Sequence, residues 1–356
     1  MSDAPRVVVA MSGGVDSSVA AALLKQQGYD VVGMMMRLWS ESGHEADNRC
    51  CTPDAMAMAR RVSARLGIPF YAVDAQETFH NVVVQYFLEG YTQGDTPNPC
   101  LACNRHIRWQ FLLQRALALD AGFMATGHYA RLQAGPDGRI QLLRAIDPAK
   151  DQSYVLHVLG QDQLKHALFP LGAYTKPQVR QLARDFGLPV AERAESQDLC
   201  FLANGDYRSF LRRHAPQVET PGPILTRDGR QLGQHQGLAF YTIGQRKGLG
   251  VFASDPLYVL EKDLDHNALI VGFVEELGRQ ELTAVNVNWI SGEAPTAPFR
   301  SQVKIRYKAR EAWATVTPLE GQRAHVAFDE PLRDITSGQA AVFYDGEIVA
   351  GGGIIL

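Results

Sequence analysis

The sequence predicts an α/β fold, with a doubly wound parallel-sheet domain followed by a small central domain and a C-terminal β-barrel. Over the first two hundred residues, short apolar runs alternate with segments of helical periodicity, which is typical of a parallel sheet covered by helices. Near residues 216–223 the chain changes to Pro, Gly and short β-rich runs. The 356 residues fit two or three compact units, and we expect domains over 1–205, 206–276 and 277–356.

In the first domain, periodicity orders the elements as strand, helix, strand and onward. Strands are expected at residues 7–10, 31–36, 70–73 and 123–126, and helices over 19–23, 55–66 and from about residue 77. The second helix carries its apolar residues on one face, at Ala55, Met58, Val62 and Leu66. This regular alternation predicts the parallel sheet.

The C-terminal part consists of short alternating runs with the spacing of a small sandwich or barrel. These runs cover residues 285–290, 301–309, 313–319, 324–329 and 339–352. Within 303–310 apolar and basic residues alternate, so we expect a strand with one cationic face there. The three glycines at 351–353 predict a flexible backbone at the C-terminal end.

Composition excludes several classes of protein. With 46% hydrophobic and 21% charged residues, the chain differs from a disordered protein, and a net charge of −3 excludes a uniformly basic coat for nucleic acid. The five cysteines are too sparse for a disulfide-framed secreted scaffold. The first apolar run is too short for a signal peptide, and no later stretch is long enough to cross a bilayer, so we expect a cytoplasmic protein without membrane association.

A glycine-rich turn follows the first expected strand and opens a helix, in the order Ser12-Gly13-Gly14-Val15-Asp16-Ser17-Ser18. Glycines allow backbone N–H groups to approach an anion, and a helix N-terminus favours negative charge. The turn lacks the lysine of a P-loop and does not match G-x-G-x-x-G. We interpret it as a phosphate-binding loop with a carboxylate suited to Mg²⁺, against the alternative of a capped strand-to-helix turn.

A second motif is the proline-rich loop 96–104, which ends in a C-x-x-C pair, Cys100 and Cys103, before a helix. Thiols at a helix N-terminus tend to ionise. A third thiol, Cys200, follows residues 195–199, and its alternative interpretation is an inert buried cysteine. A half zinc site at 100–103 lacks a conventional second pair of ligands, and we assign no role to Cys50 and Cys51.

The loop at 12–18 resembles the SGGxDS motif of the ATP pyrophosphatases, or PP-loop enzymes. With the further segments, the whole chain resembles the bacterial tRNA 2-thiouridylase family, in a form with one altered catalytic-loop residue. The matching segments are 96–104, 126–129, 150–154, 195–201, 233–237, 244–248 and 351–355. The resemblance implies a PP-loop domain of the adenine nucleotide α-hydrolase type and ATP-dependent thiolation of the C2 position of the wobble uridine, U34, in tRNA.

The resemblance also implies roles for individual residues. Cys200 would carry a persulfide, and Cys103 would be the nucleophile that completes sulfur transfer and then forms a disulfide with Cys200. A sulfur-donor protein, such as a cysteine desulfurase or a relay protein, would supply the sulfur. ATP and Mg²⁺ would bind at residues matching the family pattern: Ala10, Met11, Ser12, Gly13, Gly14, Val15, Asp16, Ser17, Met36 and Gly127, with Asp16 on Mg²⁺.

The chain departs from the commoner family pattern at Cys100, where the family usually has an Asp that is thought to act as general acid or base. That assignment therefore does not transfer. Cys100 is either an auxiliary thiol beside the persulfide pair, which we favour, or one of three ligands, with Cys103 and Cys200, of a [4Fe–4S] cluster.

The tRNA, through the anticodon stem-loop that holds the wobble uridine, is implied to contact three parts of the chain. The first is the loop at 98–100, which would face the target base. The second lies in the first domain, around residue 128 and the turn at 150–152, and the third is the barrel. The matching residues are Asn98, Pro99, Cys100, His128, Lys150, Asp151, Gln152, Arg306, Tyr307 and Gln339. Alternatives from the residues alone are a structural role for His128 and a core position for Tyr307. Basic residues at 105–108 can attract the RNA backbone, whereas Trp109 is expected in the core.

Two rival functions remain open from the sequence. A PP-loop enzyme acting on a small molecule explains residues 12–17 but leaves Cys103 and Cys200 without a role. A non-catalytic RNA-binding protein explains the basic stretch at 300–310 but not the adenylation motif.

Overall fold

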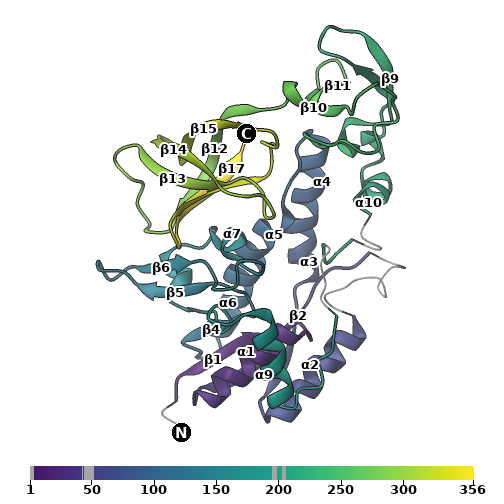
Figure 1. Ribbon diagram of the computed structural model, residues 1–356. Coiled ribbons are helices and arrows are strands. Elements are labelled where there is room, and N and C mark those ends of the chain that lie inside the picture. The colour runs from purple at the N-terminus through teal and green to yellow at the C-terminus, as the bar shows by residue number, and fades with distance from the viewer. Residues whose placement is uncertain (1–3, 42, 44–51, 195–198, 203–205) are drawn as a thin grey trace.

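The computed structural model describes residues 4–41, 43, 52–194, 199–202 and 206–356. Figure 1 shows a helix-and-sheet domain at the N-terminal end, a second sheet at the far end of α4 (Gln85–Thr92), and a C-terminal β-barrel beside that helix. Cys50, Cys51 and residues 195–198, which we interpreted from the sequence, lie outside the described residues.

The first sheet is parallel and has the strand order β3-β2-β1-β4-β7. Its strands are β1 (Arg6–Ala10), β2 (Asp30–Arg37), β3 (Phe70–Asp74), β4 (Phe123–Ala125) and β7 (Ala167–Leu168). Four of them lie where apolar runs predict them. β1 is buried because Val7, Val8 and Val9 are all fully covered, which is typical of a central parallel strand.

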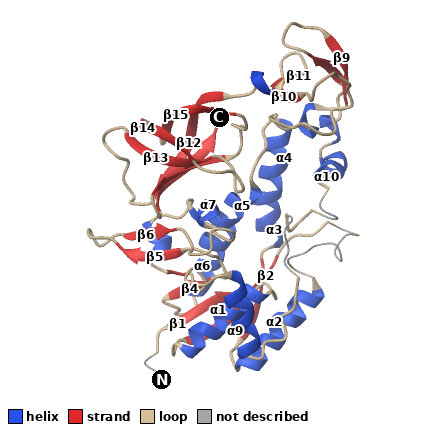
Figure 2. Ribbon diagram, in the orientation of Figure 1, coloured by secondary structure: helices blue, strands red, loops and turns tan. Residues whose placement is uncertain are grey.

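Helices cover both faces of this sheet (Figure 2). On one face, Val7 and Val9 pack with α1 (Val15–Gln26), α2 (Pro53–Leu66) and α9 (Lys176–Asp185). On the other face, Val8 packs with a helical layer that runs from α3 to α6. The doubly wound fold is therefore confirmed.

That helical layer contains two π-helical segments inside longer helices. It comprises α3 (Gln76–Phe79), η2 (His80–Val84), α4, α5 (Pro99–Ala102), η3 (Cys103–Leu112) and α6 (Leu113–Leu117). The shorter helices of the region are α7 (Ser153–Leu156) and α8 (Gln161–Leu164). π-helical turns are rare and often mark functional sites, and η3 begins at Cys103.

The central part forms a four-stranded sheet with the order β10-β11-β8-β9. Its elements are α10 (Tyr207–His214), η5 (Pro216–Val218), β8 (Gly222–Leu225), β9 (Gln231–His235), η6 (Leu238–Phe240), β10 (Tyr258–Asp263), β11 (Ala268–Gly272) and η7 (Val274–Glu276). The turns at 228–229 and 265–267 fall between its strands, as their residue types indicate.

The C-terminal part is a six-stranded antiparallel barrel closed by pairing of β12 with β17. Its strands are β12 (Arg279–Trp289), β13 (Phe299–Lys304), β14 (Ala312–Leu319), β15 (Arg323–Leu332), β16 (Ala340–Asp345) and β17 (Ile348–Ile355). A hairpin from the first part of the chain, β5 (Arg131–Ala134) and β6 (Ile140–Leu143), joins this sheet where Leu143 pairs with Ile348.

Two predictions for the barrel were wrong. The strand expected over 303–310 ends at Lys304, and the chain then turns, with Ala309 N donating to Arg306 O at 3.1 Å. The glycines at 351–353 are buried inside β17 rather than flexible. A Cβ atom on Gly352 would lie 2.7 Å from the His157 ring, so close packing requires glycine there.

Within the described ranges, no helix combines the length and apolarity that a bilayer crossing requires.

Candidate active site

The glycine-rich loop between β1 and α1 is a compact turn held by its own serines. Ser12 N donates to Ser17 Oγ at 3.1 Å, and Ser18 Oγ donates to Gly14 O at 2.7 Å. Gly13 has a φ of +70°, and a Cβ there would lie 2.3 Å from Ala55 O. Only glycine fits this position, and the loop presents the N-terminal end of α1, where backbone N–H groups attract anions.

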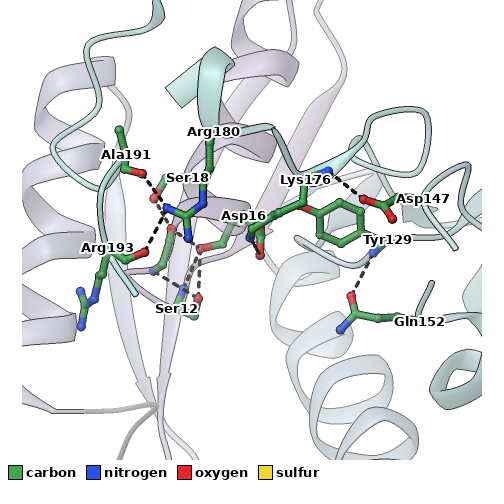
Figure 3. A network of polar contacts seen from close by, with 12 residues as sticks. Ser12, Asp16, Ser18, Tyr129, Asp147, Gln152, Lys176, Arg180, Ala191 and Arg193 are labelled. Carbon is green, nitrogen blue, oxygen red and sulfur yellow. Dashed lines mark hydrogen bonds and ion pairs between the residues drawn. The ribbon is translucent and has the colours of Figure 1, made fainter. Parts of the chain in front are cut away.

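Two residues from separate parts of the chain, Tyr129 and Lys176, meet at Asp16, in the first turn of α1 (Figure 3). Lys176 Nζ lies 2.7 and 2.8 Å from the two carboxylate oxygens, and Tyr129 Oη donates to Oδ1 at 2.8 Å. The Lys176 side chain is only 10% exposed. Lys176 was not singled out from the sequence, although its place at the start of an amphipathic helix was a signal available there.

Two arginines fix the neighbouring loop beside the glycine turn (Figure 3). Arg180 Nη1 donates to Ala191 O at 2.8 Å, and Arg193 Nη1 donates to Gly13 O at 2.9 Å. Arg180 lies one turn after Lys176 on α9. The same face of this helix therefore contacts Asp16 through Lys176 and the loop at residue 191 through Arg180. Sequence reasoning missed both arginines, since no local motif marks them.

The other residues expected at the nucleotide lie along the carboxyl edge of the sheet. Ala10 ends β1, Met36 lies near the end of β2, and Met11 N donates to Met34 O at 2.7 Å. Gly127 follows β4, and a Cβ there would lie 2.7 Å from Ser17 N. This close approach explains the need for glycine and places Gly127 against the first turn of α1.

The thiol pair lies at the start of one continuous helical segment made of α5, η3 and α6, which we call the thiol helix. Asn98 caps α5 by accepting a hydrogen bond from Cys100 N at 3.1 Å, and Pro99 occupies the first helical position. Cys100 is exposed, whereas Cys103, at the start of η3, is only 5% exposed. Asn104 donates to Cys100 O at 3.0 Å and so links the next turn of the helix to the first.

Cys200 lies in a short described turn, 199–202, and is partly buried. It packs against the same hydrophobic cluster that contains Cys103. Among the described residues, which include all three thiols, no three His, Cys, Asp or Glu side chains form a group that can hold a metal ion.

His128 is buried beside the glycine loop. Its Nδ1 lies 2.7 Å from Thr126 Oγ1, and burial, with the positive charge of Arg108 as a second cause, lowers its pKa to about 3. The imidazole is therefore neutral near pH 7 and acts as a hydrogen-bonding group rather than a cation. Trp109, expected in the core, is 1% exposed.

The turn at 150–152 lies next to Tyr129, which in turn binds Asp16 of the glycine loop. Asp151 is buried and accepts hydrogen bonds from Ala145 N at 3.0 Å and Ser153 Oγ at 2.8 Å. Gln152 Oε1 accepts from Tyr129 N at 3.0 Å (Figure 3), while Lys150 begins the turn. Asp151 thus shapes the backbone of this turn.

The barrel carries three expected RNA-contacting residues, of which Gln339 bonds to the segment that leads into the thiol helix. Tyr307 is 38% exposed rather than in the core, and burial together with the charges of Asp151 and Cys100 raises its pKa. Arg306 Nη2 donates to Ile243 O at 3.1 Å and to Thr336 Oγ1. Gln339 Nε2 donates to Thr96 O at 2.6 Å, four residues before Cys100.

The expected cationic face is partly neutralised by carboxylates of the barrel. Arg300 forms a bidentate pair with Asp329 at 2.7 and 2.6 Å, and Lys304 lies 3.6 Å from Glu311. Lys308 and Arg310 remain exposed in the turn that follows β13. The basic patch is therefore narrower than the sequence indicated.

Comparison with known proteins gives consistent matches over the whole chain. Family profiles described as "tRNA methyl transferase HUP domain", "tRNA methyl transferase PRC-barrel domain" and "Aminomethyltransferase beta-barrel domain" match residues 5–204, 208–273 and 279–355. A protein of Magnetococcus marinus named "tRNA-specific 2-thiouridylase MnmA" is 49% identical over 358 residues, 100% of both chains. The chain belongs to the tRNA-specific 2-thiouridylase family. A relative of the same name from Moorella thermoacetica is 50% identical and covers 98% of each chain.

Membership of the 2-thiouridylase family agrees with the features described above. The glycine loop opens α1 as the resemblance implied, and the chain carries the parallel-sheet domain, the central sheet and the barrel in the expected order. The family assignment covers the full chain rather than a single motif.

Proposed function

We propose that this protein uses ATP to replace the C2 oxygen of the wobble uridine in tRNA with sulfur. One observation carries the proposal: hydrogen bonds link the glycine loop to residues 151–152 through Tyr129, and the charges of Asp151 and Cys100 act together on Tyr307. Tyr129 Oη donates to Asp16, Tyr129 N donates to Gln152 Oε1, and the charges of Asp151 and Cys100 both raise the pKa of Tyr307. Phosphate chemistry and thiol chemistry thus meet at one edge of the sheet.

In the first step, the C2 oxygen attacks the α-phosphate of ATP, and pyrophosphate leaves. The loop Ser12–Ser17 stabilises the charge that develops on the phosphates, because its backbone N–H groups are fixed before the reaction. Ala10, Met11, Met36 and Gly127 line the nucleotide along the sheet edge. Lys176 neutralises negative charge beside the loop.

Mg²⁺ is implied by ATP chemistry, and the residues present fit it. Asp16 supplies two carboxylate oxygens at the mouth of the loop, and Mg²⁺ in such sites is held by one or two carboxylates with the phosphates. Bound there, the ion would offset phosphate charge. Lys176 compensates the Asp16 carboxylate in the structure described here.

In the second step, the terminal sulfur of a Cys200 persulfide attacks C2 and displaces AMP. The Cys103 thiolate then attacks Sγ of Cys200, so that the S–S bond to the uridine breaks and the 2-thiouridine leaves. The product on the enzyme is a Cys103–Cys200 disulfide, which an external thiol reductant returns to two thiols. A sulfur-donor protein, such as a cysteine desulfurase or relay protein, renews the persulfide.

Cys100 is proposed as an auxiliary thiol beside this pair. It is exposed at the first turn of α5, where the helix N-terminus favours the thiolate. A [4Fe–4S] cluster with Cys100, Cys103 and Cys200 as ligands is the alternative to this persulfide route.

The tRNA is proposed to lie between the barrel and the thiol helix. Asn98, Pro99 and Cys100 would face the target base, and Lys150, Gln152, Arg306, Tyr307 and Gln339 the anticodon backbone. A wobble uridine is already single-stranded, so turning it toward Cys103 costs less than opening a duplex. His128, being buried, would act through its hydrogen bonds.

The experiment combines tRNA, ATP, Mg²⁺ and a persulfide donor and identifies the nucleosides by mass spectrometry. We expect 2-thiouridine and AMP in equal amounts. Loss of product in both Cys103→Ser and Cys200→Ser, with ATP binding retained, would support the thiol route. Full thiolation in both variants would exclude it, and AMP formed only with a small-molecule acceptor would favour the rival PP-loop function.

A further inference from the structure

The segment from Gly94 to Pro97, which leads from α4 into the thiol helix, is the place where all three parts of the chain meet. Figure 1 shows α4 running between the barrel and α10 toward the central sheet. Gly94 has a φ of +86°, and Asp95 N returns to Gly90 O at 2.8 Å, so the chain reverses sharply before Cys100. Neither the family motifs nor the proposed chemistry uses Gly94 or Asp95.

The barrel holds this segment through the loop between β15 and β16. Thr96 N donates to Ser337 O at 3.0 Å, Gln339 Nε2 donates to Thr96 O, and Ser337 Oγ donates to the Asp95 carboxylate. Gly338 lies so close that a Cβ there would be 3.0 Å from the Asp95 Cβ and the Thr96 backbone. The two loops are thus paired through backbone and side chains.

The central sheet reaches the same segment from β10. Lys262 Nζ is buried and makes no hydrogen bond within the described part of the chain. Burial lowers the pKa of Lys262 to about 8, and the charge of Asp95 opposes this lowering. Leu264 fills the space beside Gly94, where a Cβ would lie 2.7 Å from its Cδ2. The negative charge of Asp95 therefore favours the charged form of the buried Lys262 ammonium.

We propose that Asp95 is a positioning residue for the thiol helix: held by Ser337 and next to Gly94, against which Leu264 packs, it fixes the start of residues 96–103 against the barrel and the central sheet. The inference rests on the proposed function in assigning sulfur transfer to that helix. Its physical consequence is independent of the assignment. Because only four residues, two of them prolines, separate Asp95 from Cys100, a shift at Asp95 moves both thiols.

The test measures how fast iodoacetamide alkylates Cys103 in the whole protein, without ATP or tRNA, by peptide mass spectrometry. Cys103 is 5% exposed, so its alkylation reports movement of the helix start. In Asp95→Asn and Ser337→Ala we expect the rate to rise at least about fivefold, since loss of about one interaction permits local opening. Asp162→Asn and Ser291→Ala, whose side chains bond only at exposed surfaces, are the matched controls and should match the parent.

A double variant separates positioning from general loss of structure. Asp95→Asn leaves the Lys262 ammonium buried without the Asp95 charge, so Cys103 in Asp95→Asn/Lys262→Met should be alkylated more slowly than in Asp95→Asn alone.

With tRNA, we expect Asp95→Asn to lower kcat for thiolation about tenfold with KM for tRNA within about twofold. Cys103 alkylation equal to the Asp162→Asn control in both Asp95→Asn and Ser337→Ala would overturn the proposal. Ser337→Ala removes one hydroxyl and keeps the test valid if Asp95→Asn does not fold. Because alkylation needs neither substrate, failure of the proposed function leaves this readout unchanged.

Discussion

Lys176 binds both carboxylate oxygens of Asp16, at 2.7 and 2.8 Å, although 160 residues separate them in the chain. This pair joins α9 to the first turn of α1 and sets the charge at the glycine loop. When ATP and Mg²⁺ bind, the Lys176 ammonium can leave the Asp16 carboxylate and bind phosphate oxygens instead.

We predict that Lys176→Ala lowers the rate of AMP formation with tRNA by about a hundredfold, because it removes a fixed positive charge beside the phosphates. Asp16→Ala should have an effect of similar size. The measurement is AMP release at saturating ATP. Lys165→Ala, an exposed lysine that pairs with Asp162, is the control and should keep the parent rate. Equal rates in Lys176→Ala and Lys165→Ala would contradict this assignment.

Gly127 provides a steric test of the same loop. A Cβ at Gly127 would lie 2.7 Å from Ser17 N, so Gly127→Ala should push α1 away from β4 and weaken ATP binding at least about tenfold. Calorimetric titration with ATP measures this. Gly122→Ala, where nothing lies within 4 Å of the added Cβ, should bind ATP as the parent does. Normal binding by Gly127→Ala would show that the loop tolerates displacement.

The thiols have separable roles. We expect Cys103→Ser and Cys200→Ser to abolish 2-thiouridine formation, since each removes one sulfur of the transfer. Cys100→Asp, which restores the residue of the commoner family pattern, should keep thiolation within about tenfold of the parent. Nucleoside mass spectrometry distinguishes these variants. Loss of all activity in Cys100→Asp, together with bound iron in the active parent, would favour the cluster route.

Burial of His128 makes stability depend on pH. Its pKa is about 3 in the folded protein against 6.5 for an exposed imidazole, so the unfolded chain binds the proton more readily as pH falls below 6.5. The contribution of neutral, buried His128 to the free energy of unfolding is therefore complete above pH 6.5 and is lost as the pH falls toward 3. Between pH 7 and 5.5 the parent should lose about 1 kcal/mol more free energy of unfolding than His128→Gln. Urea unfolding at both pH values measures this, and equal losses would mean that His128 is protonated when folded.

Tyr307 tests the proposed RNA surface of the barrel. Tyr307→Ala should raise the Kd for tRNA about tenfold through loss of a stacking surface, whereas Tyr307→Phe should bind nearly as the parent does. The control is Trp313→Ala, which removes an aromatic ring that is 52% exposed elsewhere on the barrel. Filter binding at fixed salt gives the comparison. A larger effect from Trp313 than from Tyr307 would move the tRNA surface to β14.

The sequence predicted those features that depend on local pattern. The run of valines at 7–9, the glycine turn after it and the helix that follows are encoded within about twenty residues, and the structure has them as expected. The C-x-x-C pair was expected just before a helix, but the helix begins earlier, at Pro99 with Asn98 as its cap, so Cys100 and Cys103 lie within the helical segment.

Features that depend on distant contacts were not predictable in this way. Alternation at 303–310 indicated a strand, but Arg306 is drawn to Ile243 O and Thr336, and the chain turns there instead. The glycines at 351–353 indicated flexibility, whereas the His157 ring and the backbones of β12 and β16 demand glycine. Lys176, Arg193 and the Asp95–Ser337 contact involve partners more than a hundred residues away, which no local pattern reports.

The central claim is that ATP activates the C2 oxygen of the wobble uridine before sulfur replaces it. The most direct measurement uses an anticodon stem-loop whose wobble uridine carries ¹⁸O at C2, incubated with the protein, ATP, Mg²⁺ and a persulfide donor. The account predicts that the label appears in AMP, one ¹⁸O for each 2-thiouridine formed. Unlabelled AMP, or 2-thiouridine formed with the label released as water, would contradict it.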